Sequence, residues 1–229
     1  MNLLREYIRG LLTETVEQIS QIQPDSIIYC DMDGVLVDFQ TNTIELVDTL
    51  LSGESVPGIY GDKRFFQLLD KIKLELGKDF IVSSGADLNL KPVRKFMFYV
   101  ISMNPGGFYA SLPPLPDGAE QLWPYLAESG HRLNILSAPV SGKKGAPMTA
   151  AEGKKRWVEE NLSPAPEEVI IMPAAGKPEY ATLQGIPNIL IDDKASTVRT
   201  WNDRGGVGVL HIPGDSNTTI SRLRELGLK

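Results

Sequence analysis

Two aspartates stand two positions apart directly after an apolar stretch of the chain. The stretch covers residues 26–30, and Asp31, Asp33 and Gly34 follow it. Side chains of a strand alternate between its faces, so both carboxylates would point the same way if the strand ran on. Two like charges this close repel each other unless a cation or a shared proton relieves them. Mg²⁺ prefers hard oxygen ligands and is usually held by one or two carboxylates together with phosphate oxygens. The pair therefore predicts a phosphatase site.

The same pair is also common in solvated turns, because acidic residues gather in loops. Further polar residues at later strand ends argue for chemistry: Ser137, Lys177, Asp192 and Asp193. Taken singly, Ser137 is typical of a strand-end hydroxyl, Lys177 of a solvated loop and the acid pair of a helix cap. All four motifs at successive strand ends are an improbable coincidence, so the joint pattern favours one functional site.

The elements that carry these residues alternate between strands and helices. The apolar runs predict strands at residues 26–30, 133–137, 168–173, 188–193 and 207–211, and helical stretches lie at 117–129, 150–161 and 195–203. Strands separated by helices imply a parallel sheet with right-handed crossovers. Ligands of such α/β sheets bind at the carboxyl ends of the strands, where the polar residues fall.

The order of these motifs resembles that of the haloacid dehalogenase-like (HAD) phosphohydrolases. Their pattern is Asp-X-Asp on the first strand, Ser or Thr ending the second, then a Lys, then an acid pair, and the resemblance spans residues 26–211. Residues 31–39, 112–119 and 154–160 are similar to segments of the 5'(3')-deoxyribonucleotidase family. The resemblance implies a HAD-like Rossmannoid parallel sheet with helices on both faces and an inserted small helical cap. It also implies Mg²⁺ as cofactor and hydrolysis of (deoxy)nucleoside monophosphates.

The resemblance also decides which residue takes which catalytic role. Asp31 is expected to be the nucleophile that forms an aspartyl-phosphate, and Asp33 the general acid and base. The expected Mg²⁺ ligands are Asp31, the backbone carbonyl of Asp33, and Asp192, with Asp193 orienting a metal-bound water or Lys177. Ser137 and Lys177 are expected to contact the phosphoryl group.

A further phosphate contact is expected from Lys154. Lys155, Lys143 and Lys144 are near it in the sequence and could take its place. Lys194 follows the acid pair and leaves a similar ambiguity for Lys177, although position and order favour Lys177.

Residues 40–110 are too long for a crossover loop and predict a separate helical cap. Residues 43–51, 64–76 and 93–103 have apolar side chains at helical spacing. The expected division is therefore an N-terminal amphipathic helix at 1–23, a core at 24–39 and 111–229, and the cap between. Phe39, Phe108 and Tyr109 stand near the two hinges and are expected, by the resemblance, to contact a nucleobase. The polar segment 83–87 has no assigned role.

Two other functions stay open. One is a HAD phosphatase that acts on another small phosphate ester or on a 3'-phosphate end. The other is a non-catalytic, phospho-accepting binding module, since receiver domains also place acids, a hydroxyl and a lysine around an aspartyl-phosphate. Receiver domains carry the acid pair on the first strand, whereas here the acceptor-type Asp-X-Asp comes first. Asp33 also supplies an acid and base that a long-lived phospho-aspartate would lack.

The composition of the chain limits which partners and which cellular location can be expected. The net charge of -6 argues against long nucleic acids as partners. No apolar run is long enough for a membrane span, and a cytoplasmic location is expected. The N-terminal stripe, which includes Leu4, Ile8 and Leu11, predicts a helix packed on the core or on a second copy of the chain. A docking leader is the alternative, because residues 1–9 weakly resemble leaders of some phage-encoded proteins.

Overall fold

The computed structural model describes residues 22–59, 61–140, 142 and 144–228. Its centre is a five-stranded sheet in the order β3-β2-β1-β6-β7, with every pairing parallel. The strands are β1 (Ile28–Cys30), β2 (Leu133–Ser137), β3 (Val169–Ile171), β6 (Ile189–Asp192) and β7 (Val207–Leu210). The predicted α/β class with a parallel sheet is confirmed, and the strands lie within the predicted runs.

The strand order brings three of the predicted site residues, Asp31, Ser137 and Asp192, to one edge of the sheet. β1 lies in the middle of the sheet, with β2 on one side and β6 on the other, and Cys30 is in register with Ile135 and Ile191. Parallel strands end at the same edge, so Asp31, just after β1, lies near the ends of both neighbours. The sheet topology alone thus gathers the motifs.

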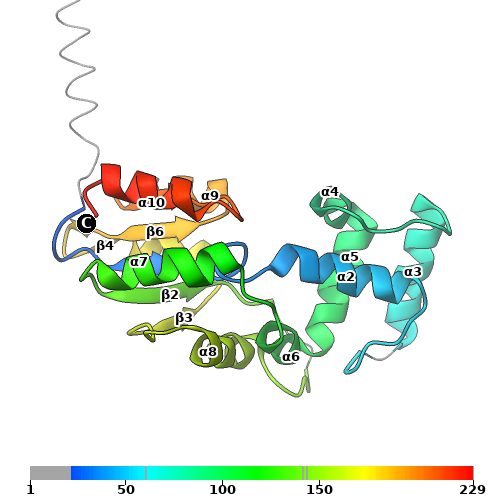
Figure 1. The fold of residues 1–229 in the computed structure, drawn as a ribbon. Coiled ribbons are helices and arrows are strands. Elements are labelled where there is room, and N and C mark those ends of the chain that lie inside the picture. Colours follow the sequence, from blue (N-terminus) through cyan, green and yellow to red (C-terminus); the bar gives the residue numbers. More distant parts are fainter. Residues whose placement is uncertain (1–21, 60, 141, 143, 229) are drawn as a thin grey trace, which may run out of the picture.

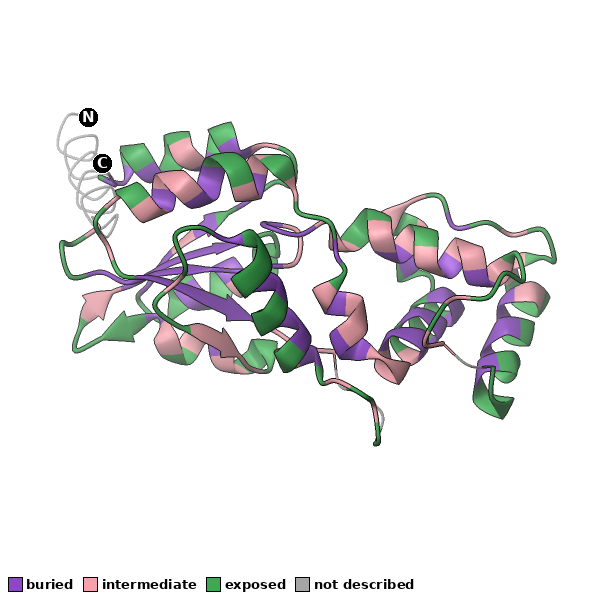
Figure 2. Cartoon of the chain, turned by 60° about the horizontal axis from the view of Figure 1, so that its bottom comes forward, coloured by how far each residue is buried: buried purple, intermediate pink, exposed green. Residues whose placement is uncertain are grey.

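Helices cover both faces of the sheet (Figure 1). Strand residues alternate between the faces. Ile28 belongs to the apolar cluster that contains Trp123, while Tyr29 faces the other side and packs with Leu190 and Trp201. Figure 2 shows the central strands as buried. The helices of this part are α7 (Trp123–Glu128), α8 (Ala150–Asn161), α9 (Ala195–Asp203) and α10 (Ser216–Glu225).

Several local features differ from the expected elements. The helix expected at 117–129 begins with a π-helical segment, Asp117–Leu122, before α7. Lys177 lies in a 3₁₀ segment, Ala174–Tyr180, and a small hairpin of β4 (Thr182–Leu183) and β5 (Ile186–Pro187) follows it. Short apolar runs of two residues carry no periodicity, so the sequence could not indicate this hairpin.

The cap helices have an apolar cluster of their own. They are α2 (Phe39–Leu51), α3 (Lys63–Leu76), α4 (Gly85–Asn89) and α5 (Lys91–Met103). Figure 1 shows these helices to one side of the sheet. The segment 83–87 starts α4: the Ser84 hydroxyl accepts from the Asp87 N–H, and the Asp87 carboxylate accepts from the Ser84 N–H. α6 (Pro105–Ala110), which falls inside the expected cap range, packs on α8 of the core.

The N-terminal helix expected at residues 1–23 lies almost wholly outside the described residues, which begin at residue 22. Within the described ranges, none of the helices has the length and apolar character needed to cross a membrane.

A buried histidine lies at the end of β7 and gives the fold a dependence on pH. The Nδ1 atom of His211 is 2.9 Å from Thr219 Oγ1, and its Nε2 atom is 4.0 Å from Asp117 Oδ2. Burial lowers the pKa of His211, and the charges of Asp117 and Asp215 only partly oppose this. The folded state therefore favours the neutral ring. Its contribution to stability is complete above the unfolded pKa of about 6.5 and is lost as the pH falls toward the lower folded pKa.

The free energy of unfolding should consequently fall more between pH 7.5 and 5.5 in the wild type than in His211→Gln. Urea denaturation at both pH values measures this difference. The matched control is His131→Gln, the other histidine of the chain, which should keep the wild-type loss. Equal losses in wild type and His211→Gln would contradict the assignment.

Candidate active site

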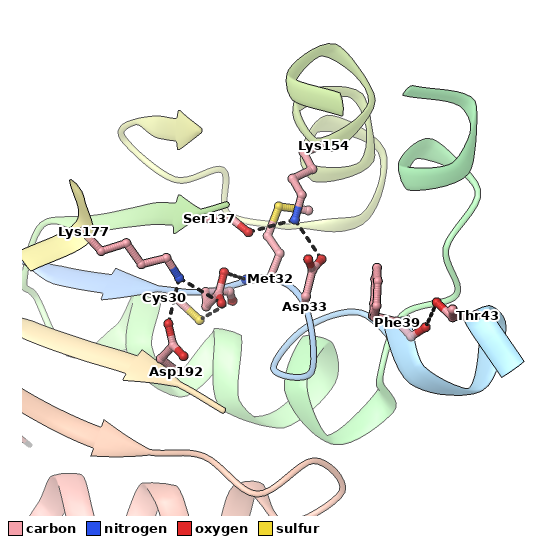
Figure 3. A network of polar contacts seen from close by, with 10 residues as sticks. Cys30, Met32, Asp33, Phe39, Thr43, Ser137, Lys154, Lys177 and Asp192 are labelled. Carbon is pink, nitrogen blue, oxygen red and sulfur yellow. Dashed lines mark hydrogen bonds and ion pairs between the residues drawn. The ribbon is translucent and has the colours of Figure 1, made fainter. Parts of the chain in front are cut away.

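Lys177 lies between two carboxylates at the carboxyl edge of the sheet (Figure 3). Its Nζ atom is 2.9 Å from Asp31 Oδ2 and 2.7 Å from Asp192 Oδ2. All three side chains are nearly inaccessible to water, with Lys177 2 % and Asp192 1 % exposed. A buried charge without a partner is costly, so the lysine and the carboxylates stabilise each other in this position.

Lys154 forms the second half of the network. Its Nζ atom donates to Asp33 Oδ1 and to Ser137 Oγ, both at 2.8 Å. The Lys154 side chain is fully buried, while Lys155 is exposed. Among the lysines that the sequence left as alternatives, Lys144 is also exposed, and Lys143 lies outside the described residues. The structure thus brings Lys154 to the predicted site.

A close crossing of two helices sets the position of Lys154. Gly153 on α8 meets Gly106 on α6, and a Cβ atom on Gly153 would stand 2.1 Å from the Gly106 carbonyl oxygen. The ammonium group of Lys154 lies over the face of the Tyr109 ring, also on α6, with Nζ 4.2 Å from the ring centroid. Cation–π contacts of desolvated lysines are worth about 2 kcal/mol. The Tyr109 ring therefore stabilises the buried charge of Lys154.

A tight turn after β1 leaves room for the carboxylate of Asp193, which follows β6. Gly34 has φ +75°, and a Cβ atom there would stand 2.4 Å from Asp193 Oδ2. The carboxylate oxygens of Asp31, Asp192 and Asp193 lie within 4.8 Å of one another. Asp193 was expected to orient a metal-bound water or Lys177, and this stays a prediction. Lys177 is paired with Asp31 and Asp192, and Asp193 lies beside these two carboxylates.

The neighbouring charges shift the pKa values of Asp31 and Asp33 in opposite directions. Burial acts to raise the pKa of Asp31, but the positive charges of Lys177 and Lys154 outweigh it, so the pKa is lowered. For Asp33, burial and the negative charge of Asp31 outweigh the attraction of Lys154, and the pKa is raised. Asp31 is therefore held ionised, and Asp33 retains a proton more readily.

The carboxylate cluster fits a divalent metal ion. Burial and the charge of Asp31 raise the pKa of Asp192. The pKa of Asp193 rises to about 7, because the surrounding protein and the charges of Asp31 and Asp192 disfavour its ionised form, although its side chain reaches solvent. Lys177 pairs with only two of these three carboxylates, and hard oxygen donors with an excess of negative charge are the donor set that Mg²⁺ takes. Asp31, Asp192 and Asp193 would hold the ion.

A cavity of about 610 Å³ opens beside the network, between core and cap. Asp33, Asp193 and Gly34 line its inner end, and Phe39 lies on its wall. Further lining residues come from α4 and α5: Gly85, Leu88, Asn89, Arg94, Met97 and Phe98. The spacing of Arg94, Met97 and Phe98 places them on one face of α5. In the sequence, only this helical spacing could have indicated that these three residues share one surface.

The three predicted aromatic contacts are placed differently from one another. Phe39 lines the large cavity, and its ring packs edge-on against Phe108 at 5.7 Å and stacks with Tyr109 at 6.3 Å. Phe108 lines a separate cavity of about 220 Å³ beside Val56. Tyr109 is 1 % exposed under Lys154. The structure therefore brings only Phe39 of these three to the cavity beside the network.

No family model matches the sequence, and no curated protein is similar to it at a significant level. Solved structures with a similar arrangement include a dehalogenase, at 14% identity and TM-score 0.46, covering 91% of this chain and 99% of that one. A phosphonoacetaldehyde hydrolase-like protein from Oleispira antarctica has 12% identity, TM-score 0.45 and coverage of 92% and 88%. A HAD family enzyme from Bacteroides thetaiotaomicron in complex with magnesium has 16% identity, TM-score 0.44 and coverage of 87% and 100%. At this level of similarity, only the residues of the site themselves indicate what chemistry it can perform.

Replacing Gly153 by Ala should destabilise the fold. Alanine gains about 1 kcal/mol over glycine within a helix, but its Cβ atom would press on the backbone of α6. Overpacking costs about 1 to 3 kcal/mol and is greatest against backbone, so we expect a net loss in the free energy of unfolding. Chemical denaturation measures it, with Lys155→Ala on the exposed side of α8 as control. A stabilised Gly153→Ala protein would show that α6 and α8 do not meet here.

Proposed function

We propose that this protein is a Mg²⁺-dependent phosphomonoester hydrolase of the HAD type that acts through an aspartyl-phosphate. We propose (deoxy)nucleoside monophosphates as its substrates. One observation carries the proposal: two aspartates two positions apart are held by separate lysines, Asp31 by Lys177 and Asp33 by Lys154. This arrangement gives the neighbouring carboxyl groups different chemical roles.

Asp31 has the properties of the nucleophile. Lys177 and Lys154 keep it ionised, and the N–H of Met32 donates to its Oδ1 atom at 2.8 Å. These contacts fix the carboxylate, so little motion is needed before attack on phosphorus. The attack would break the ester bond and leave the phosphoryl group on Asp31, which splits hydrolysis into two easier steps.

Asp33 has the properties of the general acid and base. Its pKa is raised, and its side chain lines the cavity where the leaving group would lie. The acid gives its proton to the departing alkoxide, and the resulting carboxylate takes a proton from the water that hydrolyses the aspartyl-phosphate. The hydrogen bond from Lys154 holds the carboxyl group in one orientation for both steps.

Positive charge must balance an attack of one anion on another. Lys154 and Lys177 supply part of it next to the reacting carboxylates, and Ser137 offers a hydroxyl beside Lys154. When bound by Asp31, Asp192 and Asp193, Mg²⁺ would neutralise phosphoryl oxygens and the nucleophile. The lysines alone leave the four carboxylates of the site with an excess of negative charge, which supports the metal requirement.

The choice of nucleotides rests on the motif resemblance and on Phe39. Its ring lies on the cavity wall near Asp33, and aromatic rings are a common surface for stacking bases. Other small phosphate esters, including a 3'-phosphate end, remain alternative substrates of the same mechanism.

The substitution Asp31→Asn should abolish phosphatase turnover, because a neutral amide is not a nucleophile for phosphorus. Release of phosphate from p-nitrophenyl phosphate and from a panel of nucleoside monophosphates measures this. Circular dichroism should show an intact fold, and Asp203→Ala on the exposed side of α9 should keep full activity. Wild-type turnover in Asp31→Asn would exclude the covalent mechanism.

Removal of divalent metal with EDTA should eliminate activity, and added Mg²⁺ should restore it. Asp192→Ala takes away one carboxylate of the cluster, so the Mg²⁺ concentration for half-maximal activity should rise at least about tenfold. A metal titration of wild type and variant measures the shift. Activity that survives complete chelation would contradict the metal assignment.

The substitution Phe39→Ala should reduce kcat/KM for a nucleoside monophosphate more than for p-nitrophenyl phosphate. Stacking contributes about 1 to 3 kcal/mol per base, which corresponds to about 5- to 150-fold in that preference. Phe66→Ala is the matched control, since Phe66 is an exposed cap phenylalanine away from the cavity lining. Equal losses on both substrates in Phe39→Ala would make Phe39 a packing residue and leave a HAD-type phosphatase without nucleotide preference.

A further inference from the structure

The cap wall of the large cavity carries a single charge. Helices α2, α4 and α5 contribute Phe39, Gln40, Thr41, Gly85, Leu88, Asn89, Arg94, Met97 and Phe98 to the lining. Arg94 is the only charged residue among them. The acids of the lining all come from the core side or from the segment before α2: Asp33, Asp38 and Asp193. The cavity is therefore negative at its reactive end and positive on its cap wall.

Arg94 is available to a ligand. Its backbone N–H donates to the Leu90 carbonyl, but within the described part of the chain its guanidinium forms no hydrogen bond or ion pair, and the side chain is exposed. The charged groups of the reactive end are engaged with one another, as with Lys154 and Asp33 or Lys177 and Asp31. An arginine that lines a cavity without a partner differs in this respect from the lysines of the network.

The surroundings of Arg94 would strengthen its attraction for an anion. It shares the face of α5 with Met97 and Phe98, and Leu88 of α4 also lines the cavity. Apolar walls of a cleft lower the local dielectric and focus the field of a charge. A second cation, Lys194, lines the core side of the same cavity. Both positive side chains lie outside the buried network that holds the reacting carboxylates.

We propose that Arg94 binds a second anionic group, a carboxylate or a phosphate, carried by the leaving group of the substrate. The inference rests on the proposed function, because it takes the scissile phosphoryl group to lie at Asp31 and the leaving group to extend past Asp33 into the cavity. The planar guanidinium can bind either anion through two parallel hydrogen bonds. Among nucleotides and other small esters, those with a second negative group at the cap wall would thus be hydrolysed in preference to their counterparts without it.

Two matched substrate pairs test this with Mg²⁺ present. The first is 4-carboxyphenyl phosphate against 4-carbamoylphenyl phosphate, which differ by a carboxylate in place of an amide. The second is a nucleoside 3',5'-bisphosphate against the corresponding 5'-monophosphate, which tests a phosphate as the second anion. The ratio of kcat/KM within each pair is measured for wild type, Arg94→Gln, Arg94→Lys and Lys95→Gln. Lys95 is the matched control, because it is an exposed neighbour on α5 outside the cavity lining.

We expect the wild type to prefer the doubly anionic member of at least one pair. Arg94→Gln should reduce that preference about tenfold or more, the size expected for a hydrogen-bonded charge pair, chiefly through KM. Arg94→Lys should retain part of it, and Lys95→Gln should retain all of it. The pair that responds identifies the anion as carboxylate or phosphate.

Two outcomes would overturn the inference and remain distinguishable. If esters are hydrolysed but the wild type shows no preference in either pair, or Arg94→Gln keeps the preference, the second-anion site is wrong while the phosphatase stands. If none of the four esters releases phosphate, the proposed function itself is wrong, and the inference falls with it.

Discussion

The repulsion among carboxylates at one edge of the sheet is the constraint on which the rest of the site depends. Asp31, Asp33, Asp192 and Asp193 converge there. Burial and the negative charge of Asp31 raise the pKa values of the other three, while the lysines lower that of Asp31. Buried like charges are stable only with compensating cations. Lys177 and Lys154 provide two, and a divalent ion fits the remaining excess. The cations that compensate this repulsion in the folded protein would also supply the positive charge that the proposed phosphate substrate requires.

The scaffold meets this constraint by placing each cation on a different element. Lys177 comes from the 3₁₀ segment after β3, and Lys154 from α8, whose position depends on the close contact of Gly153 with Gly106. Because α6 directly follows the cap helices, the cap and the lysine that orients Asp33 share one packing contact. The orientation of Asp33 is thus linked to the cap helices that line the large cavity.

The sequence was sufficient for those features that depend on local pattern and order. Apolar runs and helical spacing located the five strands and the helices 150–161 and 195–203, because buried strands and amphipathic helices each have a characteristic pattern of apolar residues. The motif order likewise gathered Asp31, Ser137 and Asp192, since parallel strands end at one edge. The cluster role of Asp193 depends instead on the turn at Gly34, whose partner lies far along the chain.

Contacts between distant segments could not be predicted. Nothing in the local sequence distinguishes Lys154 from Lys155 except the face of α8 that meets the core. Tyr109 was expected at a nucleobase, but its buried ring lies against the Lys154 ammonium group, where α6 packs on α8. Arg94 carried no motif, and only the assembled cavity gives it a role.

We propose that hydrolysis passes through a phosphoryl group on Asp31. The stereochemistry at phosphorus tests it most directly, because each displacement inverts the configuration. A phosphorothioate monoester made chiral with ¹⁸O, hydrolysed in H₂¹⁷O, should give inorganic thiophosphate with net retention, the result of two successive displacements. Net inversion would mean direct attack of water on the substrate and would contradict the nucleophilic role of Asp31.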